Sequence, residues 1–289
     1  MHRLQQTLDG LKSQDLDKAL WEIIIIDNNS NNNFAEQLEL SWHPSARIVT
    51  EPKQGLTHAR LKGFAEAKGN VIIMIDDDNV AEPNYLSEVK RIFESDSELG
   101  AIGGKSLPIF EAPAPDWLQE FYGNLALRDP GEEIITSKWE SRYPEYSPLG
   151  AGMALRREAL RAYTDKATAG ESLISDRSGG SLTSSGDNDI VIEVLKSWWS
   201  VGYFPSLVIH HIIPKERLQV DYLARLINNT SKSWVQLLDS HGISLWEKVP
   251  AWSLPLRKAK AWIVQKAWKG PANYIRWRGI CGTFDALAG

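Results

Sequence analysis

Cysteine is almost absent from the sequence, which contains one, Cys281, among 289 residues. A single thiol cannot form a disulfide framework within the chain, so this absence favours a reducing compartment. We expect Cys281 to be a small core or surface residue and not a nucleophile. Long apolar runs are lacking too, because no stretch approaches the roughly 18 to 20 residues that cross a membrane.

An apolar leader is also lacking, because the segment from Leu4 to Leu11 is amphipathic, unlike the apolar centre of a signal peptide. We therefore expect a cytoplasmic protein, either unattached or peripheral on the cytoplasmic face of a membrane. The formal net charge of -5 argues against a general nucleic-acid binder. The hydrophobic content of 43% is ample for a buried core.

Several motifs that bind phosphate or metal, or carry a nucleophile, are missing. The sequence has no P-loop lysine motif, no G-x-G-x-x-G dinucleotide fingerprint and no G-x-S-x-G nucleophile elbow. An EF-hand that started at Asp76 would require glycine at position 81 and glutamate at position 87, where the sequence has Ala81 and Ser87. Isolated His43 and His58 are more typical of surface or packing residues than of metal ligands.

Three consecutive acids, Asp76, Asp77 and Asp78, directly follow the apolar run from Val71 to Ile75. A short β-branched run predicts a buried strand, so the acids fall at its carboxyl end, where open α/β sheets bind ligands. Adjacent carboxylates repel one another unless a cation or hydrogen-bond donors compensate them. Oxygen ligands favour Mg or Mn, which commonly bridge to substrate phosphates. The alternative is an acidic loop that caps the next helix.

Further acids occupy comparable positions. Asp27 follows the apolar strand predicted at residues 21–26, and neighbouring parallel strands would bring its loop to the edge that holds the three aspartates. Residues 170–188 are rich in serine and glycine and look mobile. Asp187 and Asp189 lie where this stretch ends and a predicted helix begins. Aspartate there serves either as a helix cap or as a catalytic base.

The alternation of strands and helices predicts an α/β protein with a doubly wound, mainly parallel sheet and helices on both faces. Strands are predicted at residues 21–26, 47–50, 71–75, 101–104 and 207–213, and helices at residues 3–19, 55–68, 84–94 and 189–199. Prolines should break residues 107–148 into loops and short helices that shape a pocket. After Pro214 the chain should be helical.

Six segments follow one another in the order EIIIIDNNS (22–30), EPKQGLTHAR (51–60), IDDDN (75–79) with Pro83, GAGMALRR (150–157), GDNDI (186–190) and PSLVIHH (205–211). In this order they resemble the family 2 glycosyltransferases of the GT-A fold. The resemblance implies a GT-A core over residues 1–213. The remaining residues 214–289 would form a helical appendage.

For the nucleotide-sugar donor, the resemblance assigns roles by position. Asp27 would contact the nucleobase or ribose, and Arg60 would lie near the base or the diphosphate. Asp76 and Asp78 would hold a divalent cation, Mg or Mn, and the ribose, with Asp77 assisting.

For the acceptor side, the resemblance assigns Asp187 as the general base. Asp189 would support the loop or the acceptor. His211, or its neighbour His210, would approach the metal or the pyrophosphate, although a plain strand-end role is the alternative.

Together these roles imply an inverting, metal-dependent transfer from a UDP- or GDP-sugar to a hydroxyl of a saccharide or lipid-linked acceptor, in surface polysaccharide biosynthesis. Two departures keep other readings open. Gly186 replaces the first acid of the family's "ED" pair, and the family's first apolar strand is not found before the first predicted helix. The alternatives are a degenerate, non-catalytic sugar-nucleotide-binding or scaffold protein, and a nucleotidyltransferase, which would usually carry a glycine-rich loop that is not seen.

The carboxyl-terminal region has an unusual charge pattern, because residues 248–284 contain no acid. Basic and aromatic side chains alternate there: Arg257, Lys258, Lys260, Lys266, Lys269, Arg276 and Arg278 with Trp252, Trp262, Trp268, Tyr274 and Trp277. Cationic, tryptophan-rich helices suit an anionic membrane surface. A helical layer that packs on the core is the alternative, and nucleic acid is a poorer fit because the rest of the chain is acidic.

Overall fold

The computed structural model describes residues 2–30, 34–169 and 185–288. Asn31 to Asn33, and most of the segment predicted to be mobile, lie outside these residues. The described chain divides into two compact units. The first contains residues 2–109, 127–169 and 187–212, and the second contains residues 110–126 and 213–288 with Ser185 and Gly186.

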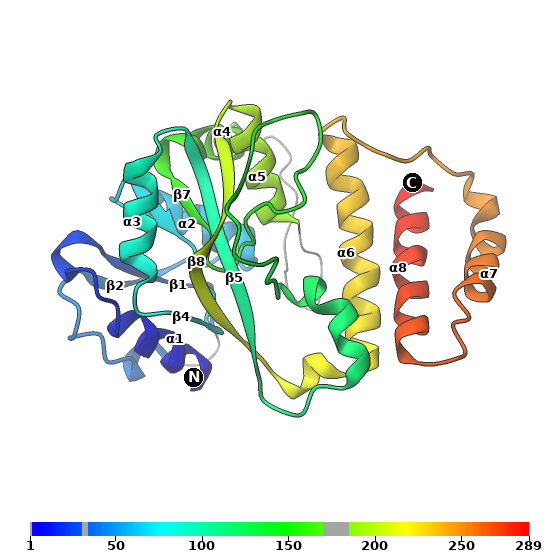
Figure 1. The fold of residues 1–289 in the computed structure, drawn as a ribbon, viewed down its shortest axis with the longest axis horizontal. Helices are drawn as coiled ribbons and strands as arrows, with labels where there is room; N and C mark the ends of the chain where they lie inside the picture. The colour runs from blue at the N-terminus through cyan, green and yellow to red at the C-terminus, as the bar shows by residue number, and fades with distance from the viewer. Residues whose placement is uncertain (1, 31–33, 170–184, 289) are drawn as a thin grey trace. The chain divides into compact units, whose positions relative to one another are not determined.

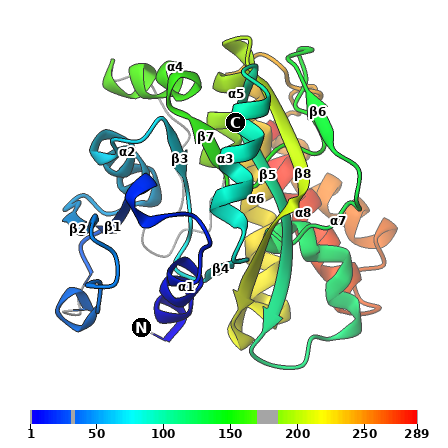
Figure 2. The same ribbon diagram turned by 60° about the vertical axis from the view of Figure 1, so that its left-hand side comes forward.

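The first unit holds two sheets (Figure 2). One pairs β1 (Ile23–Asp27) with β2 (Ala46–Thr50) in parallel, with Ile23 opposite Ala46 and Asp27 opposite Thr50. The other has the order β3-β7-β5-β8-β4, with β6 on β8. Its strands are β3 (Val71–Ile73), β4 (Asn79–Ala81), β5 (Leu99–Phe110), β6 (Ile135–Ser137), β7 (Ala154–Arg156) and β8 (Ser200–Ile213).

The predicted α/β class is confirmed, and the strand directions are mixed. β1 and β2 run parallel, as predicted. Antiparallel pairs join β7 to β3 and β5, and β8 to β4 and β6. The sequence did not reveal these pairs because β4, β6 and β7 are each 3 residues long, too short for a recognisable period.

The two sheets are not joined by strand pairing among the described residues, and we call the boundary between β1 and β3 the seam. β1 pairs with β2, β3 ends the order of the second sheet, and within the described residues no strand pairs with both β1 and β3. The residues before β1 form the helix α1 (His2–Lys12) and the short helix η1 (Lys18–Leu20). Ile24, Ile25 and Ile26 of β1 are only partly buried. Among the described residues, the strand that ends at Asp27 and the strand before the three aspartates therefore share no strand partner.

Four longer helices complete the first unit: α2 (Leu56–Glu66), α3 (Tyr85–Ser95), α4 (Arg157–Thr168) and α5 (Gly186–Lys196), with the short helix η2 (Phe34–Gln37). α3 buries one face because Tyr85, Val89 and Ile92 recur at helical spacing. Those residues pack against Ile102 of β5 and Ile209 of β8. A second cluster joins α2, α4 and α5, through Phe64, Tyr163 and Ile190 among others.

The second unit is helical, as predicted for the chain after Pro214, and it also takes in part of the proline-rich segment. Its elements are η3 (Asp116–Leu125), η4 (Lys215–Leu218), α6 (Val220–Ser240), η5 (Ala251–Ser253), α7 (Leu254–Val264) and α8 (Pro271–Leu287). α6 and α8 lie side by side in Figures 1 and 2. A hydrogen bond from Asn228 Nδ2 to the Arg278 carbonyl, 2.8 Å long, joins them. Within the described residues, no helix combines the length and apolar character needed to span a bilayer.

Candidate active site

The three aspartates form the turn between β3 and β4. The backbone N–H of Asn79 donates to the Asp76 carbonyl over 3.1 Å, and the N–H of Ile212 in β8 donates to the Asp78 carbonyl over 2.8 Å. Asp77 is exposed, Asp76 is partly buried and Asp78 is buried. The acids therefore end a strand, as predicted, and β8 fixes the backbone of the innermost one.

The buried carboxylate of Asp78 faces a histidine. Nε2 of His211 lies 3.4 Å from Oδ2 of Asp78, and the two residues are 6% and 7% exposed. Asn79 Nδ2 donates to Oδ1 of Asp78 over 3.3 Å. Oδ1 of Asn79 is buried and has no hydrogen-bond partner in the described part of the chain. Carboxylate and amide oxygens are ligands that suit Mn or Mg, so the oxygens of Asp78 and Asn79 fit the predicted cation.

The strand β8 decides which of its two histidines belongs to this group. Successive side chains of a strand point to opposite faces. His211 is opposite Asn79 in the antiparallel register and faces Asp78. His210 is opposite Val80, and its Nε2 lies 2.6 Å from Oε1 of Glu82. The structure therefore associates His211, not His210, with the aspartates.

A second group joins Asp187 to Arg60. Asp187 lies in the first turn of α5, where its Oδ2 accepts the Gly150 N–H over 3.0 Å and its Oδ1 accepts the Asn188 N–H over 3.0 Å. A Cβ atom added to Gly150 would lie 2.8 Å from Oδ2 of Asp187 and 3.0 Å from Nη2 of Arg60. Both groups therefore approach the Gly150 backbone where a larger residue would place its side chain, and such a residue would displace them.

Backbone hydrogen bonds join the turn that carries Gly150 to Met74, two residues before the acidic loop. The Gly152 N–H donates to the Met74 carbonyl, and the Met74 N–H donates to the Met153 carbonyl, each over 2.9 Å. Gly150 is two residues before Gly152, and Asp76 is two residues after Met74, and two residues span at most about 7 Å. Gly152 has a φ of 78°, a conformation that favours glycine. The turn of residues 150–152 therefore connects the general-base candidate to the acidic loop.

Sequence reasoning did not single out two neighbours of Asp187. The Tyr143 hydroxyl donates to Oδ1 of Asn188 over 2.6 Å. Burial raises the pKa of Tyr143 well above its ordinary value, and the nearby charge of Asp187 adds to this shift. Burial lowers the pKa of Arg128, whose guanidinium group donates to the Ser147 carbonyl. Both lie in the proline-rich segment predicted to shape a pocket, but no residue spacing marked them individually.

Asp27 lies at the end of β1, and its Oδ1 accepts the Ser30 N–H over 2.9 Å. The following Asn28 was not singled out from the sequence, yet it joins two loops. Its Nδ2 donates to the Glu51 carbonyl over 3.1 Å, and its Oδ1 accepts the Gly55 N–H over 2.7 Å. Asn28 thereby holds the loop of Asp27 against the start of α2, the helix that carries Arg60.

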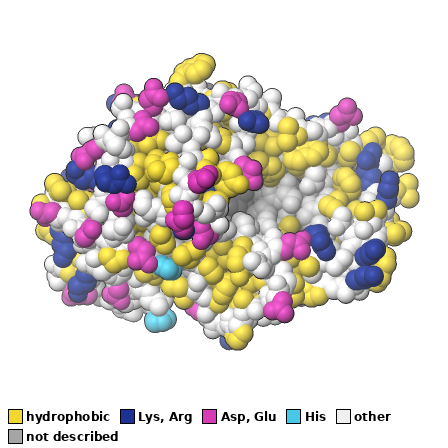
Figure 3. Space-filling view, viewed as in Figure 1, with side chains coloured by type: hydrophobic (Ala, Val, Ile, Leu, Met, Phe, Trp, Pro, Cys, Tyr) yellow, Lys and Arg dark blue, Asp and Glu magenta, His cyan; other side chains and the backbone are white. Residues whose placement is uncertain are grey.

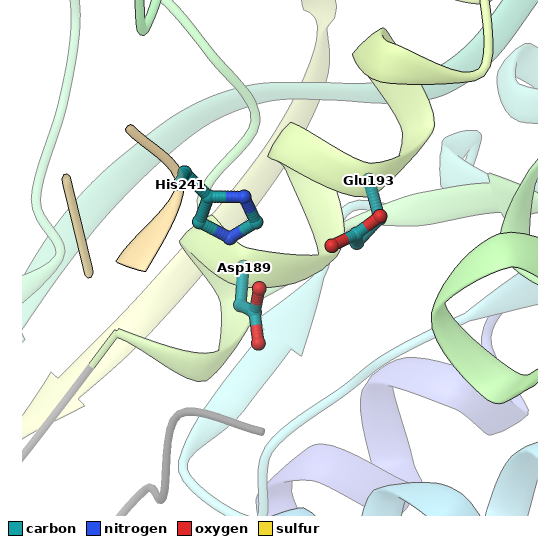
Figure 4. A group of neighbouring side chains, drawn as sticks. All are labelled: Asp189, Glu193 and His241. Atoms are coloured by element: carbon teal, nitrogen blue, oxygen red, sulfur yellow. The ribbon is translucent and has the colours of Figure 1, made fainter. Parts of the chain in front are cut away.

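Asp189 has a different environment from Asp187. It is fully buried, and Nζ of Lys166 lies 3.6 Å from its Oδ1. Lys166 also contacts Glu193 over 2.9 Å. Figure 4 shows Glu193 on the same helix as Asp189, one turn along α5. Burial opposes the charge of Lys166, but its hydrogen bond to Glu193 and the charge of Asp189 raise its pKa overall. This pairing is compatible with a supporting role for Asp189. His241, which is also labelled in Figure 4, belongs to the second unit.

Comparison with known sequences gives consistent similarities. Residues 2–163 match the sequence profile of glycosyl transferase family 2. Glucosyl-dolichyl phosphate glucuronosyltransferase of Haloferax volcanii is 27% identical over 124 residues, which are 40% of this chain and 38% of that protein. A probable glycosyltransferase of Bacillus subtilis is 24% identical over 224 residues, 71% of this chain and 46% of that protein. The chain spans less than half the length of these two relatives.

Among solved structures, the crystal structure of GalNAc-T7 with UDP, GalNAc and Mn2+ is similar. Its TM-score is 0.54 at 17% sequence identity, and the match covers 98% of this chain and 53% of that one. A similarity at this identity concerns the fold, and it agrees with the α/β architecture expected from the sequence.

Proposed function

Because the chain belongs to glycosyl transferase family 2, we propose that it transfers a sugar from a nucleotide-diphosphate sugar to a hydroxyl acceptor with inversion of the anomeric centre. The observation that carries this proposal is the approach of Asp187 and Arg60 to Gly150, in a turn that is hydrogen-bonded to the segment before the acidic loop. A base and a cationic group next to a candidate cation site are the parts that such a transfer requires.

The donor side of the proposal rests on the acidic loop. Asp76, Asp78 and His211 would hold Mg or Mn, since Asp78 and His211 already lie within 3.4 Å of each other. A bound cation would neutralise the charge that develops on the leaving diphosphate. Asp27 would contact the base or ribose, with the exposed Asp77 assisting. The UDP and Mn2+ bound in GalNAc-T7 support a UDP-sugar and a cation, and a GDP-sugar is the alternative.

The acceptor side rests on Asp187. Its two oxygens each accept one backbone N–H, which fixes the orientation of the carboxylate. A carboxylate oxygen has two lone pairs, so each retains one to receive a proton from the acceptor hydroxyl. The deprotonated hydroxyl would attack the anomeric carbon in line with the departing diphosphate, which inverts that centre without a covalent enzyme intermediate. The guanidinium group of Arg60 would add positive charge where the diphosphate leaves.

The acceptor is proposed to be a saccharide or a lipid-linked saccharide in surface polysaccharide biosynthesis. The name of the Haloferax relative, which contains glucosyl-dolichyl phosphate, supports a lipid-linked acceptor. We place the catalytic part in residues 1–213, in the cytoplasm, with residues 214–289 as the helical appendage. The predicted peripheral position on a membrane depends on the surface of α7.

A non-catalytic sugar-nucleotide-binding protein is the second candidate. The seam between β1 and β3 favours it, because Asp27 follows a strand that has one partner instead of two. A loosely held Asp27 would weaken donor binding and misplace the sugar. Binding and turnover must therefore be measured separately.

The experiment is a donor panel. UDP- and GDP-sugars are incubated with Mn2+, with Mg2+ or with EDTA, and nucleotide binding, release of nucleoside diphosphate and transfer to simple glycosides are recorded. Cation-dependent release, with a product of inverted anomeric configuration by NMR, is expected. Cation-dependent binding without turnover would favour the second candidate, and the absence of nucleotide binding under all conditions would overturn both.

A further inference from the structure

The aromatic and aliphatic side chains of residues 248–284 divide into two sets. The inward set holds α7 against α8. The rings of Trp262 and Trp277 meet edge to face with centroids 4.7 Å apart, and the Trp277 indole N–H donates to the Lys258 carbonyl over 3.0 Å. Ala261 of α7 is also buried, with 8% of its surface exposed. This set accounts for the helix-packing reading of the region.

The outward set is exposed among the residues that the structure describes. Trp252 is 78% exposed, Leu256 69% and Ile263 64%. Leu256, Ala259 and Ile263 recur at spacings of three and four residues, so they form one stripe along α7, and Trp252 precedes it by one turn. Most of the large apolar side chains that are exposed in the described part of the chain lie between residues 245 and 268. A surface helix of an ordinary soluble unit would place polar residues in this stripe.

Basic side chains flank the stripe. Arg257, Lys260, Lys266 and Lys269 are all exposed, and residues 248–284 contain no acid. Lys258 differs because it points toward α8 and pairs with Asp285 over 2.6 Å. Yellow and dark-blue side chains lie next to each other at the right-hand end of Figure 3, where Figure 1 places α7. The exposed surface of α7 and the residues just after it thus combines apolar and positively charged side chains.

We propose that the outward face of α7 binds an anionic lipid bilayer, with the helix lying in the plane of the surface. Leu256 and Ile263 would enter the boundary between headgroups and acyl chains, and the indole of Trp252 would lie at headgroup level. Lys260 and Lys266 would contact anionic headgroups while their alkyl stems cover apolar surface. The inward set keeps α7 attached to α8, so the helix needs no rearrangement to present this face.

A bilayer fits this face better than a protein partner. The exposed basic residues lie along the same segment as the apolar stripe, and that segment contains no acid, which matches a uniformly negative surface and would repel a second copy of the same face. Exposed tryptophan beside aliphatic residues is the composition of helices that lie at a membrane interface. The inference does not depend on the transfer chemistry, since lipid binding is measured without donor or acceptor.

The experiment is co-sedimentation of the full chain with vesicles. Vesicles of phosphatidylcholine alone are compared with vesicles that contain about 30% phosphatidylglycerol. This anionic lipid makes the vesicle surface negative. The unaltered protein should bind the anionic vesicles and lose binding as salt is raised. The double variant Leu256→Ser, Ile263→Ser should bind about tenfold more weakly or worse, because both side chains leave the interface.

Matched controls separate this effect from general loss of surface hydrophobicity. Leu20 and Ile134, each 62% exposed, lie in the first unit, and the double variant Leu20→Ser, Ile134→Ser should bind vesicles as the unaltered protein does. Lys260→Glu with Lys266→Glu should remove the preference for anionic vesicles. Unchanged circular dichroism and thermal unfolding in each variant establish that it has folded.

Three results would overturn the proposal. They are failure of the unaltered protein to bind anionic vesicles at low salt, equal binding by the Leu256→Ser, Ile263→Ser variant, and equal loss of binding in the control variant. A further contrary result would be self-association of the unaltered protein that this variant abolishes in analytical ultracentrifugation, which would assign the face to a second copy. Loss of sugar transfer with intact vesicle binding would leave the proposal standing and count against the proposed function alone.

Discussion

Nε2 of His211 lies 3.4 Å from Oδ2 of Asp78, and the backbone register sets this approach. Asn79, the residue after Asp78, is directly opposite His211 in the antiparallel pair of β4 and β8. The Asp78 carbonyl also accepts the Ile212 N–H. A side chain at the tip of a turn would ordinarily be adjustable, but here a strand ladder positions both partners, which is the preorganisation that a cation site requires.

The first prediction concerns this pair. Asp78→Ala removes a buried carboxylate from the proposed cation site. Mn2+ or Mg2+ should strengthen binding of UDP or GDP to the unaltered protein, and this gain should disappear in the variant, leaving only weak cation-independent binding. Isothermal titration calorimetry measures nucleotide binding in the presence and in the absence of the cation. An unchanged cation-dependent gain in Asp78→Ala would remove this residue from the site.

The neighbouring histidines provide a matched pair of variants. His211→Ala should reduce the cation-dependent gain, because His211 faces Asp78. His210→Ala should retain it, because His210 faces Glu82 on the other side of β8. Equal effects of the two substitutions would mean that the strand end matters as a whole and that neither imidazole contacts the cation.

The second prediction concerns the general base. Asp187→Asn keeps the size of the side chain and the acceptor oxygen for the Gly150 N–H, but it cannot take a proton from the acceptor. Turnover should fall by about a hundredfold or more while donor binding remains. Asp189→Asn should instead lower the melting temperature, because Lys166 loses a partner that is 3.6 Å away. Near-normal turnover in Asp187→Asn would move the base elsewhere, with Asp189 the first candidate.

Much of this site was predictable from local patterns, and the exceptions have identifiable causes. The aspartates follow a short β-branched run, so their place after a strand was predicted from that local pattern. The predicted helix of residues 3–19 ends at Lys12 instead, because the Gln14 side chain donates to the Gly10 carbonyl and, over 2.8 Å, to the Glu82 carbonyl. No local pattern encodes that long-range bond.

The approach of Arg60 and Asp187 to Gly150 was likewise not encoded locally. The two residues lie on different helices, and Gly150 carries no Cβ atom that would displace them. The resemblance to a family assigned each residue a role separately, but tertiary packing determines whether the roles are combined. Strand lengths also depended on tertiary context: β5 extends from Leu99 to Phe110, whereas the apolar pattern marked only residues 101–104.

The third prediction concerns pH and Glu22, which borders the seam. Its Oε2 pairs with Arg47 and its Oε1 accepts the Lys68 N–H, each over 2.6 Å. Burial would raise the pKa of Glu22, but these two hydrogen bonds lower it below the ordinary value. A lowered folded-state pKa stabilises the fold at pH values above the unfolded pKa of about 4.3, and this contribution is lost as the pH falls through the folded value.

Glu22→Gln should therefore reduce the free energy of unfolding by about 1 kcal/mol or less at pH 7, since the group is partly screened by solvent. The difference from the unaltered protein should shrink below about pH 4. Urea unfolding between pH 3 and pH 7 measures it. Glu94→Gln, which removes an exposed pair with Lys90 on α3, is the control and should cost little at any pH. A constant difference across this range would mean that the charge of Glu22 is not involved.

The last prediction concerns the seam itself. α2 contacts both of its sides: a Cβ atom on Gly63 would lie 3.6 Å from Ile26 of β1, and the adjacent Phe64 shares a core cluster with Met74, which follows β3. The facing edges of β1 and β3 have no shared strand partner among the described residues. An apolar strand between them would pair with backbone groups on both edges and cover the partly buried isoleucines, a gain of several kcal/mol.

We therefore expect a protein extended upstream of α1 by an apolar, β-branched strand and a short polar loop to melt at a higher temperature and to transfer sugar faster. The amide protons of Ile24 to Ile26 should exchange more slowly, because a strand on the open edge would protect them. An extension of equal length made of glycine and serine is the control, since it adds chain without strand propensity. Equal melting temperature, amide exchange and activity for the two extended proteins would show that the edges of β1 and β3 do not accept a strand. The order of the Asp27 loop would then not depend on an added strand.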